Sequence, residues 1–403
     1  DRFSIYDYCS LIPDICKAGK TVASIPNSAY AYHLDAVALG VYLKGYSEKN
    51  GVRHISDTIT SVLQNEDGSI RELVTENGEP VKGDLFIDCS GFRSMLLGKT
   101  LGEPFEEYND YLFNDSAIAI RLPFEDKEKE MVSYTLCTAL SSGWAWTIPL
   151  YNRLGTGYVY CSKYLSKDQA EQEFRTFLGK FLGQARLEDA QARHLGIRVG
   201  KHERTWVKNC VGIGLSSGFI EPLESTGLQI VQSEVDLLTQ TLKGRNDYTV
   251  ADMAVYNASI KKLLSVIRDF LVCHFALTSR EDTPYWKDVK YTTKISESLM
   301  EKLMFARANM PAWVSEQIFD TGGMLAGFGF TEGWYSILTG MNFLPFEFEQ
   351  HKLKKIGTYE GALVENMHEA DRISQQLDLQ RQNIGGMPSH YRYLRDNIYN
   401  GME

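Results

Sequence analysis

Apolar and polar residues follow different periods in the two halves of the chain. Up to about Gly227, short stretches with partial alternation are separated by turn signals such as Asp67-Gly68 and Asn77-Gly78, which predicts strands joined by tight turns. Beyond Gly227, apolar residues recur mainly at helical spacing. The pattern predicts an α/β part over residues 1–227 and a mainly helical part over residues 228–403.

The α/β part is expected to contain mixed sheets with helices. We predict a helix over 36–50, and a β-meander whose last strand, 81–87, runs into Asp88. A second, mostly antiparallel sheet is expected over 112–160, followed by a helix over 168–184. The strands predicted for the meander are 52–62, 70–74 and 81–87, and those of the second sheet are 116–123, 132–139, 143–150 and 157–161.

The corner at residues 217–227 joins the two parts. A predicted buried strand, 210–215, comes before it, and a predicted helix begins at about Leu228. The amides of a first helical turn have no partner within the helix and carry the positive end of its dipole. Glu224 adds one carboxylate beside these amides. The corner therefore suits a small anion.

The same residues allow a simpler interpretation. Ser225 or Thr226 is a good N-cap residue and could do no more than cap the helix. In the functional interpretation, the Thr226 hydroxyl and the Gly227 amide hold a small anion, and Glu224 faces an adjacent cavity. The residues alone leave this choice open.

A second candidate site follows the predicted strand 81–87. Ligands of α/β sheets bind at the carboxyl ends of strands, where Asp88 lies, and Gly91 lets the backbone approach a ligand closely. A plain tight turn explains the same residues. The segment alone is therefore a weak indication of a nucleotide site.

A third candidate is the segment 143–149. Strand alternation places Trp144, Trp146 and Ile148 on one face. Two tryptophans on one face of a strand are typical of a core. They also suit an aromatic wall that lines a cavity or a tunnel.

Composition narrows the possible classes of function. The chain of 403 residues has 43% hydrophobic and 23% charged residues, as globular proteins do. Its net charge of −10 argues against a nucleic-acid surface and against a polybasic membrane patch. No apolar run reaches the roughly 18 residues of a membrane span. Seven dispersed cysteines predict reduced thiols and a cytoplasmic setting, and the histidines show no metal-ligand spacing.

Four segments, taken in order, resemble the flavin-dependent tryptophan halogenase family. The segment from Trp144 to Pro149 fits the W-x-W-x-I-P motif of that family, and the likeness extends through 280–287. The resemblance implies an α/β flavin-monooxygenase-like fold with a mainly helical C-terminal part. The four segments are 30–35, 88–94, 143–149 and 221–227.

The resemblance also implies an activity. Members of the family carry out FADH2- and O2-dependent halogenation of an aromatic substrate, here tryptophan or another indole. Hypohalous acid is made at the flavin and delivered to a Lys and a Glu beside the aromatic ring. The implied cofactors are FAD, supplied as FADH2 by a separate flavin reductase, and chloride or bromide. A homodimer is a further possibility that the resemblance raises.

Two alternatives to halogenation stay open. A flavin-dependent aromatic hydroxylase of related fold would transfer oxygen and would need no anion site. A non-catalytic halogenase-like protein would only bind a ligand or partner. Halide dependence of product formation separates the first alternative from a halogenase.

The resemblance assigns roles to individual residues. Glu224 matches the catalytic carboxylate, and Thr226 and Gly227 match the halide site. The candidate flavin contacts are Ile59, Asp88, Gly91, Leu215 and Leu228. The candidate tunnel residues are Trp144, Trp146, Ile148 and Pro149. The candidate substrate contacts, which core packing would explain equally well, are Phe330, Glu332 and Trp334.

Two parts of the family pattern have no counterpart in the sequence. These are the glycine-rich dinucleotide loop and the segment with the catalytic Lys. Both belong upstream of Asp1 in the family, so we expect this chain to be the remainder of a longer protein. Lys17 and Lys20 lie in no matching context, and neither is predicted to partner Glu224.

Overall fold

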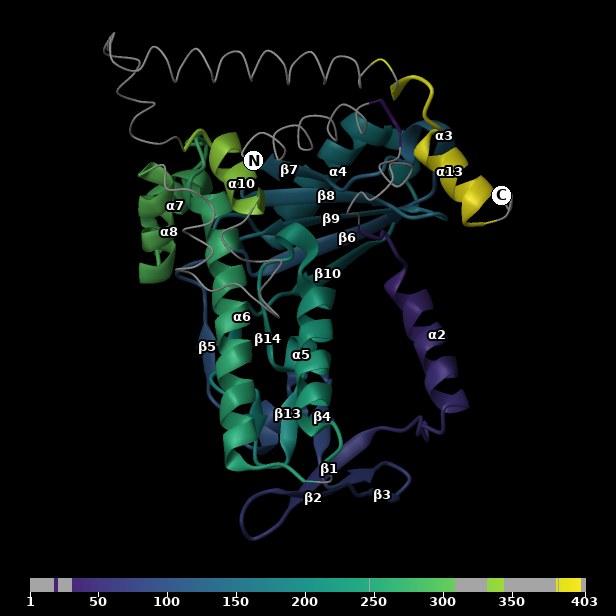
Figure 1. Ribbon diagram of the computed structural model, residues 1–403. Helices are drawn as coiled ribbons and strands as arrows, with labels where there is room; N and C mark the ends of the chain where they lie inside the picture. The colour runs from purple at the N-terminus through teal and green to yellow at the C-terminus, as the bar shows by residue number, and fades with distance from the viewer. Residues whose placement is uncertain are drawn as a thin grey trace. The chain divides into compact units, whose positions relative to one another are not determined.

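The computed structural model describes residues 18–20, 31–245, 247–308, 332–343, 382 and 384–399. Contacts between Cα atoms divide the chain into two units, which are described separately (Figure 1). The first unit comprises Asp1–Gly51, Ser116–Gly196 and Glu347–Glu403, and the second comprises Val52–Asp115 and Ile197–Phe346. The sequence predicted a flavin-binding part over 1–227 and a substrate-binding part over 228–403. That division is defined by the ligand that each part binds, so it stays a prediction.

The first unit is built on a five-stranded antiparallel sheet with the strand order β10-β6-β9-β8-β7. This sheet confirms the antiparallel arrangement predicted from the alternation over 112–160. Its strands are β6 (Ser116–Leu122), β7 (Leu136–Leu140), β8 (Gly143–Pro149), β9 (Leu154–Tyr160) and β10 (Ala192–Gly196).

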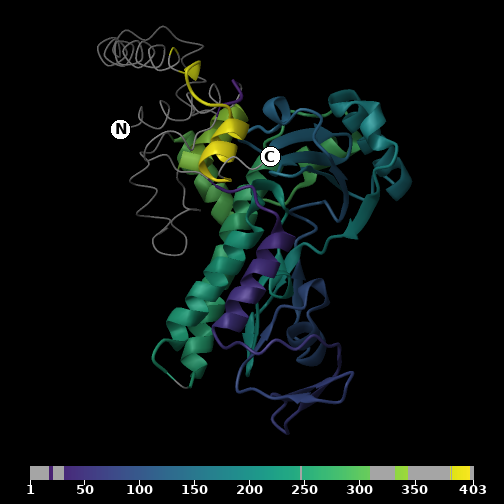
Figure 2. The same ribbon diagram turned by 90° about the vertical axis from the view of Figure 1, so that its right-hand side faces the viewer.

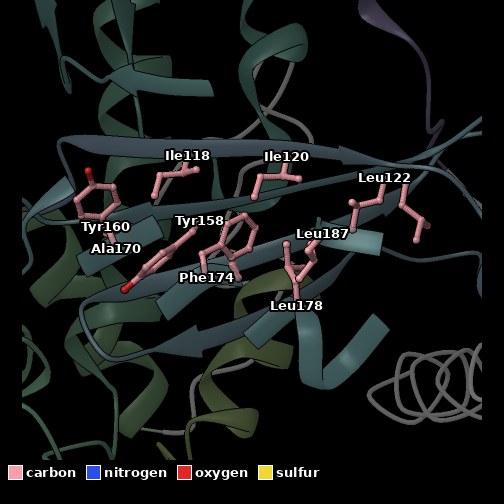
Figure 3. Packing of buried hydrophobic residues seen from close by; sticks show 11 residues of the cluster. Ile118, Ile120, Leu122, Tyr158, Tyr160, Ala170, Phe174, Leu178 and Leu187 are labelled. Carbon is pink, nitrogen blue, oxygen red and sulfur yellow. The ribbon is translucent and has the colours of Figure 1, made fainter. Parts of the chain in front are cut away.

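Helix α4 (Lys167–Leu182) packs against one face of this sheet (Figure 3). Ser166 begins the helix through a capping box with Gln169. Three α4 side chains spaced four residues apart are fully buried, and burial of each of the two large ones, Phe and Leu, stabilises the fold by roughly 1.5–3 kcal/mol. They are Ala170, Phe174 and Leu178, and they lie in one cluster with Ile118, Ile120, Leu122, Tyr158 and Tyr160.

The first unit also contains helices α2 (Ala36–Lys49), α3 (Lys127–Glu130) and α13 (His390–Asn397) and the 3-10 turn η4 (Gln184–Leu187). Helix α2 confirms the helix predicted over 36–50. The Asp35 side chain caps it by accepting from the amides of Val37 and Ala38. A hydrogen bond from Arg153, at 2.5 Å, is the main cause that lowers the pKa of Asp35 to about 2.

The second unit contains three small sheets. Strands β1 (Ile59–Gln64), β2 (Ile70–Thr75) and β3 (Pro80–Val81) form an antiparallel meander. Strands β5 (Phe105–Glu107), β11 (Gly200–His202) and β14 (Gly218–Phe219) form the second sheet. Strands β4 (Phe86–Asp88), β12 (Trp206–Val207) and β13 (Cys210–Gly212) form the third, in which β4 and β13 are parallel.

The prediction of a single strand over 81–87 was wrong. The chain leaves the meander after β3, and β4 joins another sheet, where the Phe86 amide donates to the carbonyl of Asn209 at 2.9 Å. The break falls at exposed residues around Gly83, whereas Phe86 is 6% exposed within a hydrophobic cluster. The beginning of the predicted strand 52–62 was wrong as well, because β1 begins only at Ile59.

The later part of the second unit is helical, as predicted. Among the described residues, every named strand precedes Gly227. No helix of the described segments is long and apolar enough to cross a membrane. The helices are α5 (Gly227–Leu242), α6 (Val250–Ala276), α7 (Pro284–Thr292), α8 (Glu297–Arg307) and α10 (Glu332–Gly340), and short helical turns are η2 (Gly91–Arg93), η3 (Met95–Thr100), η5 (Gly214–Ser216) and η6 (Leu223–Ser225).

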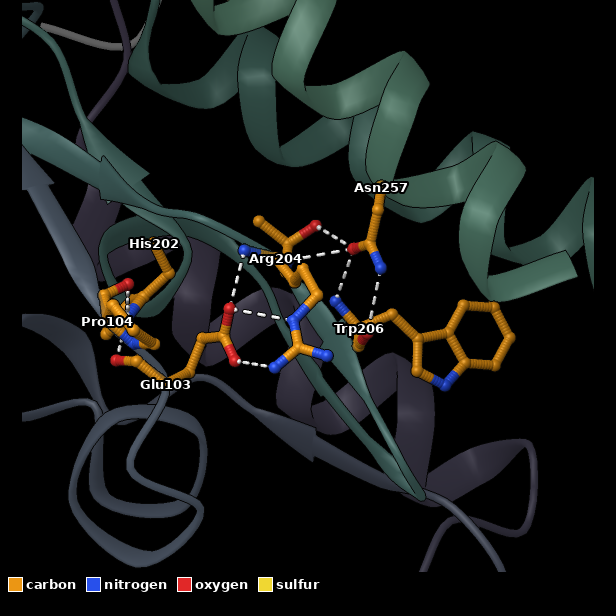
Figure 4. Close-up of polar contacts among 7 residues, drawn as sticks. Glu103, Pro104, His202, Arg204, Trp206 and Asn257 are labelled. Carbon is orange, nitrogen blue, oxygen red and sulfur yellow. Dashed lines mark hydrogen bonds and ion pairs between the residues drawn. The ribbon is translucent and has the colours of Figure 1, made fainter. Parts of the chain in front are cut away.

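Helices α5 and α6 run side by side in both views (Figures 1 and 2). Asn257 fastens α6 to β12: its side-chain oxygen accepts from the Trp206 amide at 2.8 Å, and its nitrogen donates to the Trp206 carbonyl at 2.9 Å (Figure 4). Beside it, the Glu103 carboxylate binds the guanidinium group of Arg204 with both oxygens. These partly buried contacts hold β12 against α6 and tie Arg204, just before β12, to Glu103.

Candidate active site

Glu224 lies in an unusual backbone conformation. Glu224 has φ 67° and Ser225 has φ 54°, so two successive non-glycine residues occupy the left-handed region. This region costs L-residues roughly 1–2 kcal/mol each, and such strain is typical of functional sites. The conformation brings Glu224, whose side chain is 42% exposed, to the surface just before helix α5.

No side chain at the N-cap position satisfies the first amides of α5. Thr226 occupies the N-cap position, but its side chain makes no capping hydrogen bond. A simple side-chain cap by Thr226 is therefore not formed, since its φ and ψ angles of −74° and −11° are already helical, and the choice between a capping role for Ser225 and an anion site stays open. A Cβ atom added at Gly227 would meet nothing within 4 Å. Among the described residues, nothing fills the position that a Gly227 side chain would take, whereas Thr226 beside it is buried, with 4% of its surface exposed.

A histidine contacts the Glu224 carboxylate. His274, near the end of α6, places Nε2 3.1 Å from Glu224 Oε1 and Nδ1 2.8 Å from the Phe270 carbonyl oxygen. The side chain of His274 is 9% exposed. Sequence reasoning missed this residue, because fifty positions separate it from Glu224 and no local motif marks it.

The segment before Glu224 is anchored in the interior. Glu221 is 1% exposed, and its carboxylate accepts from the Asn114 side chain at 3.2 Å. The Tyr285 hydroxyl donates to the Asn114 side-chain oxygen at 3.0 Å. Tyr285 lies at the start of α7, within the segment 280–287 where the family resemblance was noted. This chain of contacts explains how that segment supports the corner.

Asp88 organises the turn that follows β4. Its carboxylate accepts from the amides of Leu96 and Leu97 and from both the amide and the hydroxyl of Ser90, at 2.6–2.9 Å. Ser216 on η5 adds a fifth donor at 3.2 Å. Burial alone would raise the pKa of Asp88, but these hydrogen bonds outweigh burial and lower it. The protein itself thus fills the acceptor positions of this carboxylate.

Glu234 is a second buried acid beside the same turn. It is 0% exposed on α5, and it accepts from the Gly214 amide at 2.7 Å and from the Ser217 hydroxyl. Burial raises its pKa to about 7, against the opposite effect of these two hydrogen bonds. Glu234 therefore ties the turn that carries Leu215 to the helix that begins with the candidate halide site.

Sequence reasoning overlooked Glu234, although a signal existed. Ile230, Glu234 and Leu238 are the buried residues of α5 and follow each other at intervals of four. An acid in the middle of an apolar helical stripe is either paired or hydrogen-bonded in the interior. That position alone marks Glu234 as structurally or functionally important.

We expect the stability of the protein to fall as pH rises through the pKa of Glu234. The unfolded carboxyl titrates near 4.5 and the folded one near 7, so ionisation in the folded state costs about 3 kcal/mol above that range. Gln carries no charge, and its oxygen can accept from the Gly214 amide while its nitrogen donates to the Ser217 hydroxyl oxygen. The Glu234→Gln variant should therefore gain stability relative to the wild type between about pH 5 and about pH 8, measured as urea midpoints. Glu66→Gln, at an exposed position, is the control and should keep the pH dependence of the wild type. If the urea midpoint changed with pH equally in Glu66→Gln and Glu234→Gln, the raised pKa of Glu234 would be contradicted.

The two tryptophans of β8 face away from α4. Ala145 is buried in the α4 cluster, whereas Trp144 and Trp146 pack on each other with ring centroids 5.9 Å apart and planes tilted by 54°. Trp144 is 6% exposed and Trp146 is half-buried. The predicted alternation is confirmed. Because this strand belongs to the first unit and Glu224 to the second, the structure describes the two groups separately.

Gly157 makes room for Trp146. The two residues are paired across β8 and β9, and a Cβ atom added at Gly157 would overlap the indole ring of Trp146. The carbonyl oxygen of Pro149, at the end of the same motif, accepts a hydrogen bond from Nδ1 of His33 at 3.0 Å. His33 belongs to the segment 30–35 of the family resemblance, so two of the four segments meet here.

Replacing Gly157 with Ala should displace the Trp146 indole and lower stability by about 1–3 kcal/mol, as overpacking does. Gly155→Ala is the matched control two residues earlier on β9, because a Cβ atom there would meet only the Ile148 carbonyl oxygen at 3.5 Å. Near-ultraviolet circular dichroism and urea unfolding measure both effects. Equal spectra and equal midpoints for the two variants would contradict the packing described.

The candidate flavin contacts lie on several elements of the second unit. Leu215 on η5 and Leu228 in the first turn of α5 are 42% and 55% exposed, which fits apolar contact with a planar ring. Gly91 has φ 70° and open space beside it. Ile59 on β1 is half-buried and packs against the hydrophobic cluster that contains Ile70 and Phe86. The roles of these residues in flavin binding stay predictions.

The candidate substrate contacts are described only in part. Phe330 lies outside the described residues. Glu332 begins α10, and Trp334 on the same helix is 1% exposed. The Trp334 ring packs against Phe270 at a centroid distance of 5.2 Å, and Phe270 in turn packs edge-on against His274 at 4.8 Å. An aromatic row therefore leads from α10 to the histidine beside Glu224.

Comparison with known proteins identifies the class to which this arrangement belongs. A family model described as tryptophan halogenase matches residues 13–354. Tryptophan 6-halogenase SttH of Streptomyces toxytricini is 40% identical over 290 residues, which are 72% of this chain and 54% of that protein. The 7-chloro-L-tryptophan 6-halogenase KtzR of Kutzneria sp. (strain 744) is 36% identical over 338 residues, 77% of this chain and 64% of that protein.

Solved structures agree with the sequence comparison. The crystal structure of SttH superposes with a TM-score of 0.81 at 33% identity, covering 97% of this chain and 75% of that one. Tar14, a tryptophan C-6 flavin-dependent halogenase, gives a TM-score of 0.78. The chain belongs to the tryptophan halogenase family, and the mixed α/β fold predicted from the resemblance is confirmed. It spans somewhat more than half of the length of the curated relatives given above.

Proposed function

We propose that the protein halogenates tryptophan or another electron-rich indole, with Glu224 as the catalytic carboxylate. Family membership supports this proposal, and one structural observation carries it. A partly exposed carboxylate in a left-handed conformation stands directly before a helix whose N-terminus has no side-chain cap. Such a corner would put a base next to an anion site, and aromatic halogenation needs both.

The anion site is proposed to hold chloride or bromide. A fully hydrated halide is a poor nucleophile, so a site that replaces part of its hydration shell raises its reactivity. The Thr226 hydroxyl, which makes no capping bond, and the Gly227 amide can each donate one hydrogen bond. The described residues leave the position of a Gly227 side chain empty, which is compatible with an ion bound there.

Glu224 is proposed to act on the aromatic substrate. When the halogen adds to a ring carbon, the ring becomes cationic, and a nearby carboxylate stabilises that charge. The same carboxylate then takes the proton from this carbon, and the C–H electron pair returns to the ring. When bound, reduced flavin would supply two electrons to O2, and O2 would be the oxidant of the reaction. Leu215, Leu228 and Gly91 would contact the flavin.

Further parts of the proposal rest on the family alone. Trp144, Trp146, Ile148 and Pro149 are proposed to line the path between flavin and substrate. Trp334 and Glu332 are proposed to lie near the substrate, and Asp88 is proposed to shape the flavin site through its turn. A separate flavin reductase, a homodimer and a cytoplasmic setting are proposed on the same basis.

Halide dependence of the product tests the proposal. The complete protein is given reduced flavin from a reductase, O2 and tryptophan or indole, with bromide, with chloride or without halide. Mass spectrometry should show a brominated or chlorinated indole only when the matching halide is present. An oxygenated product that needs no halide would identify a hydroxylase. Flavin binding without any product from either substrate would favour the non-catalytic alternative.

A further inference from the structure

The surroundings of His274 contain more acceptors than a neutral ring can satisfy. Nδ1 lies 2.8 Å from the Phe270 carbonyl oxygen and Nε2 lies 3.1 Å from Glu224 Oε1. A carbonyl and a carboxylate both accept hydrogen bonds, whereas a neutral imidazole has a single N–H. Only one of the two contacts can then be a hydrogen bond. An additional proton between Nε2 and Oε1 satisfies both.

The backbone fixes which ring nitrogen faces Glu224. The Phe270 carbonyl lies one helical turn before His274 on α6 and accepts from Nδ1, which directs Nε2 outward to Glu224. The Phe270 ring packs edge-on against the imidazole at 4.8 Å and restricts its rotation. With its side chain 9% exposed, His274 is held from two sides.

The contact also divides the two oxygens of Glu224 into different roles. Oε1 faces His274, and within the described part of the chain no hydrogen bond engages Oε2. Glu224 itself lies in a turn with left-handed backbone at Glu224 and Ser225, and the Ser225 amide donates to the Pro222 carbonyl at 3.0 Å. The carboxylate is thus held by its backbone and by one oxygen, and its other oxygen is left for a substrate.

We propose that His274 is a positioning residue that holds Glu224 through a shared proton between Nε2 and Oε1. This inference rests on the proposed function, in which Glu224 receives the proton of the ring carbon. The C–H bond breaks, its electron pair returns to the ring and the proton goes to Oε2, while Oε1 stays bound to His274. Deleting the imidazole would leave the carboxylate free to rotate away from the substrate.

The shared proton is tested without turnover. In protein labelled with ¹⁵N-histidine, long-range ¹H–¹⁵N spectra near neutral pH should show two protonated nitrogens for the ring of His274, assigned by its loss in His274→Gln. In Glu224→Gln the side-chain amide can donate to Nε2, so one nitrogen of that ring should become unprotonated. A single N–H in the wild type, or no change in Glu224→Gln, would overturn the proposal.

Kinetics test the positioning role. His274→Leu should lower kcat by about 10- to 100-fold, the effect of losing a hydrogen bond to a charged group, with KM nearly unchanged. His274→Gln, whose amide can still donate to Oε1, should recover most of that loss. The proposal would be overturned if His274→Leu and His274→Gln had equal kcat values, or if His274→Leu kept the kcat of the wild type.

The chain offers a matched control. His194 contacts Glu171 in the same way, with Nε2 2.7 Å from Oε2, but it lies on β10 in the first unit and outside the proposed machinery. His194→Leu and His194→Gln should leave kcat unchanged within about twofold. If no variant and no wild-type sample yields a halogenated product, the proposed function fails, whereas the ¹⁵N spectra still decide the His274–Glu224 contact.

Discussion

Glu224→Gln should reduce the rate of indole halogenation by at least about 100-fold, the usual effect of removing a general base. Gln has nearly the shape of Glu but cannot take a proton and stabilises a cationic ring far less. The Glu224 side chain is 42% exposed, so the substitution should leave the fold intact. The rate is measured under single-turnover conditions in the complete protein with saturating reduced flavin and halide.

A control separates this effect from a general loss of charge. Glu203 is exposed near β11 and takes no part in the proposed chemistry, so Glu203→Gln should retain its rate within about twofold. Circular dichroism and flavin binding should be the same for both variants. A Glu224→Gln protein that halogenates at the wild-type rate would remove Glu224 from the mechanism.

Asp88→Asn should have the largest effect on stability, a loss of about 2–4 kcal/mol. Five donors converge on the carboxylate, and an amide in its place turns N–H groups towards the amides of Leu96 and Leu97 or towards Ser90. Each buried donor left without an acceptor costs roughly 1–3 kcal/mol. Urea unfolding measures the change, and flavin binding should weaken with it because the turn at Gly91 loses its support.

Asp84→Asn is the control for this substitution. Asp84 lies four residues earlier and is exposed, so its replacement should change stability by less than about 0.5 kcal/mol. Similar midpoints for Asp84→Asn and Asp88→Asn would show that the hydrogen bonds to Asp88 contribute little.

Regular elements were predictable where a local signal marks them, either the alternation of a strand or the residues that begin and end a helix. The alternation in 143–149 correctly assigned Trp144 and Trp146 to one face of β8, because side chains of a strand alternate strictly. The helix over 36–50 had both its start and its end marked by Asp35 and Asn50-Gly51. Local signals of this kind depend only on neighbouring residues.

Features that depend on distant contacts were not predictable. The segment 80–88 divides between two sheets because β4 pairs with β13, which lies more than a hundred residues later in the chain. No local sequence pattern indicates a pairing over that distance. The left-handed conformations of Glu224 and Ser225 lack the Gly or Asn that usually marks such positions. His274 reaches Glu224 only through the packing of α6. The candidate site was therefore located by motif, and its supporting residues required the structure.

Anomalous diffraction from bromide tests the halide site most directly. Crystals of the complete, flavin-bound protein soaked in bromide, with data collected at the bromine absorption edge, should show a peak in contact with the Thr226 hydroxyl and the Gly227 amide, beside Glu224. The peak should disappear after a soak in a bromide-free nitrate solution. Bromide peaks at other surface positions, with none at the start of α5, would contradict the assignment of this corner as a halide site.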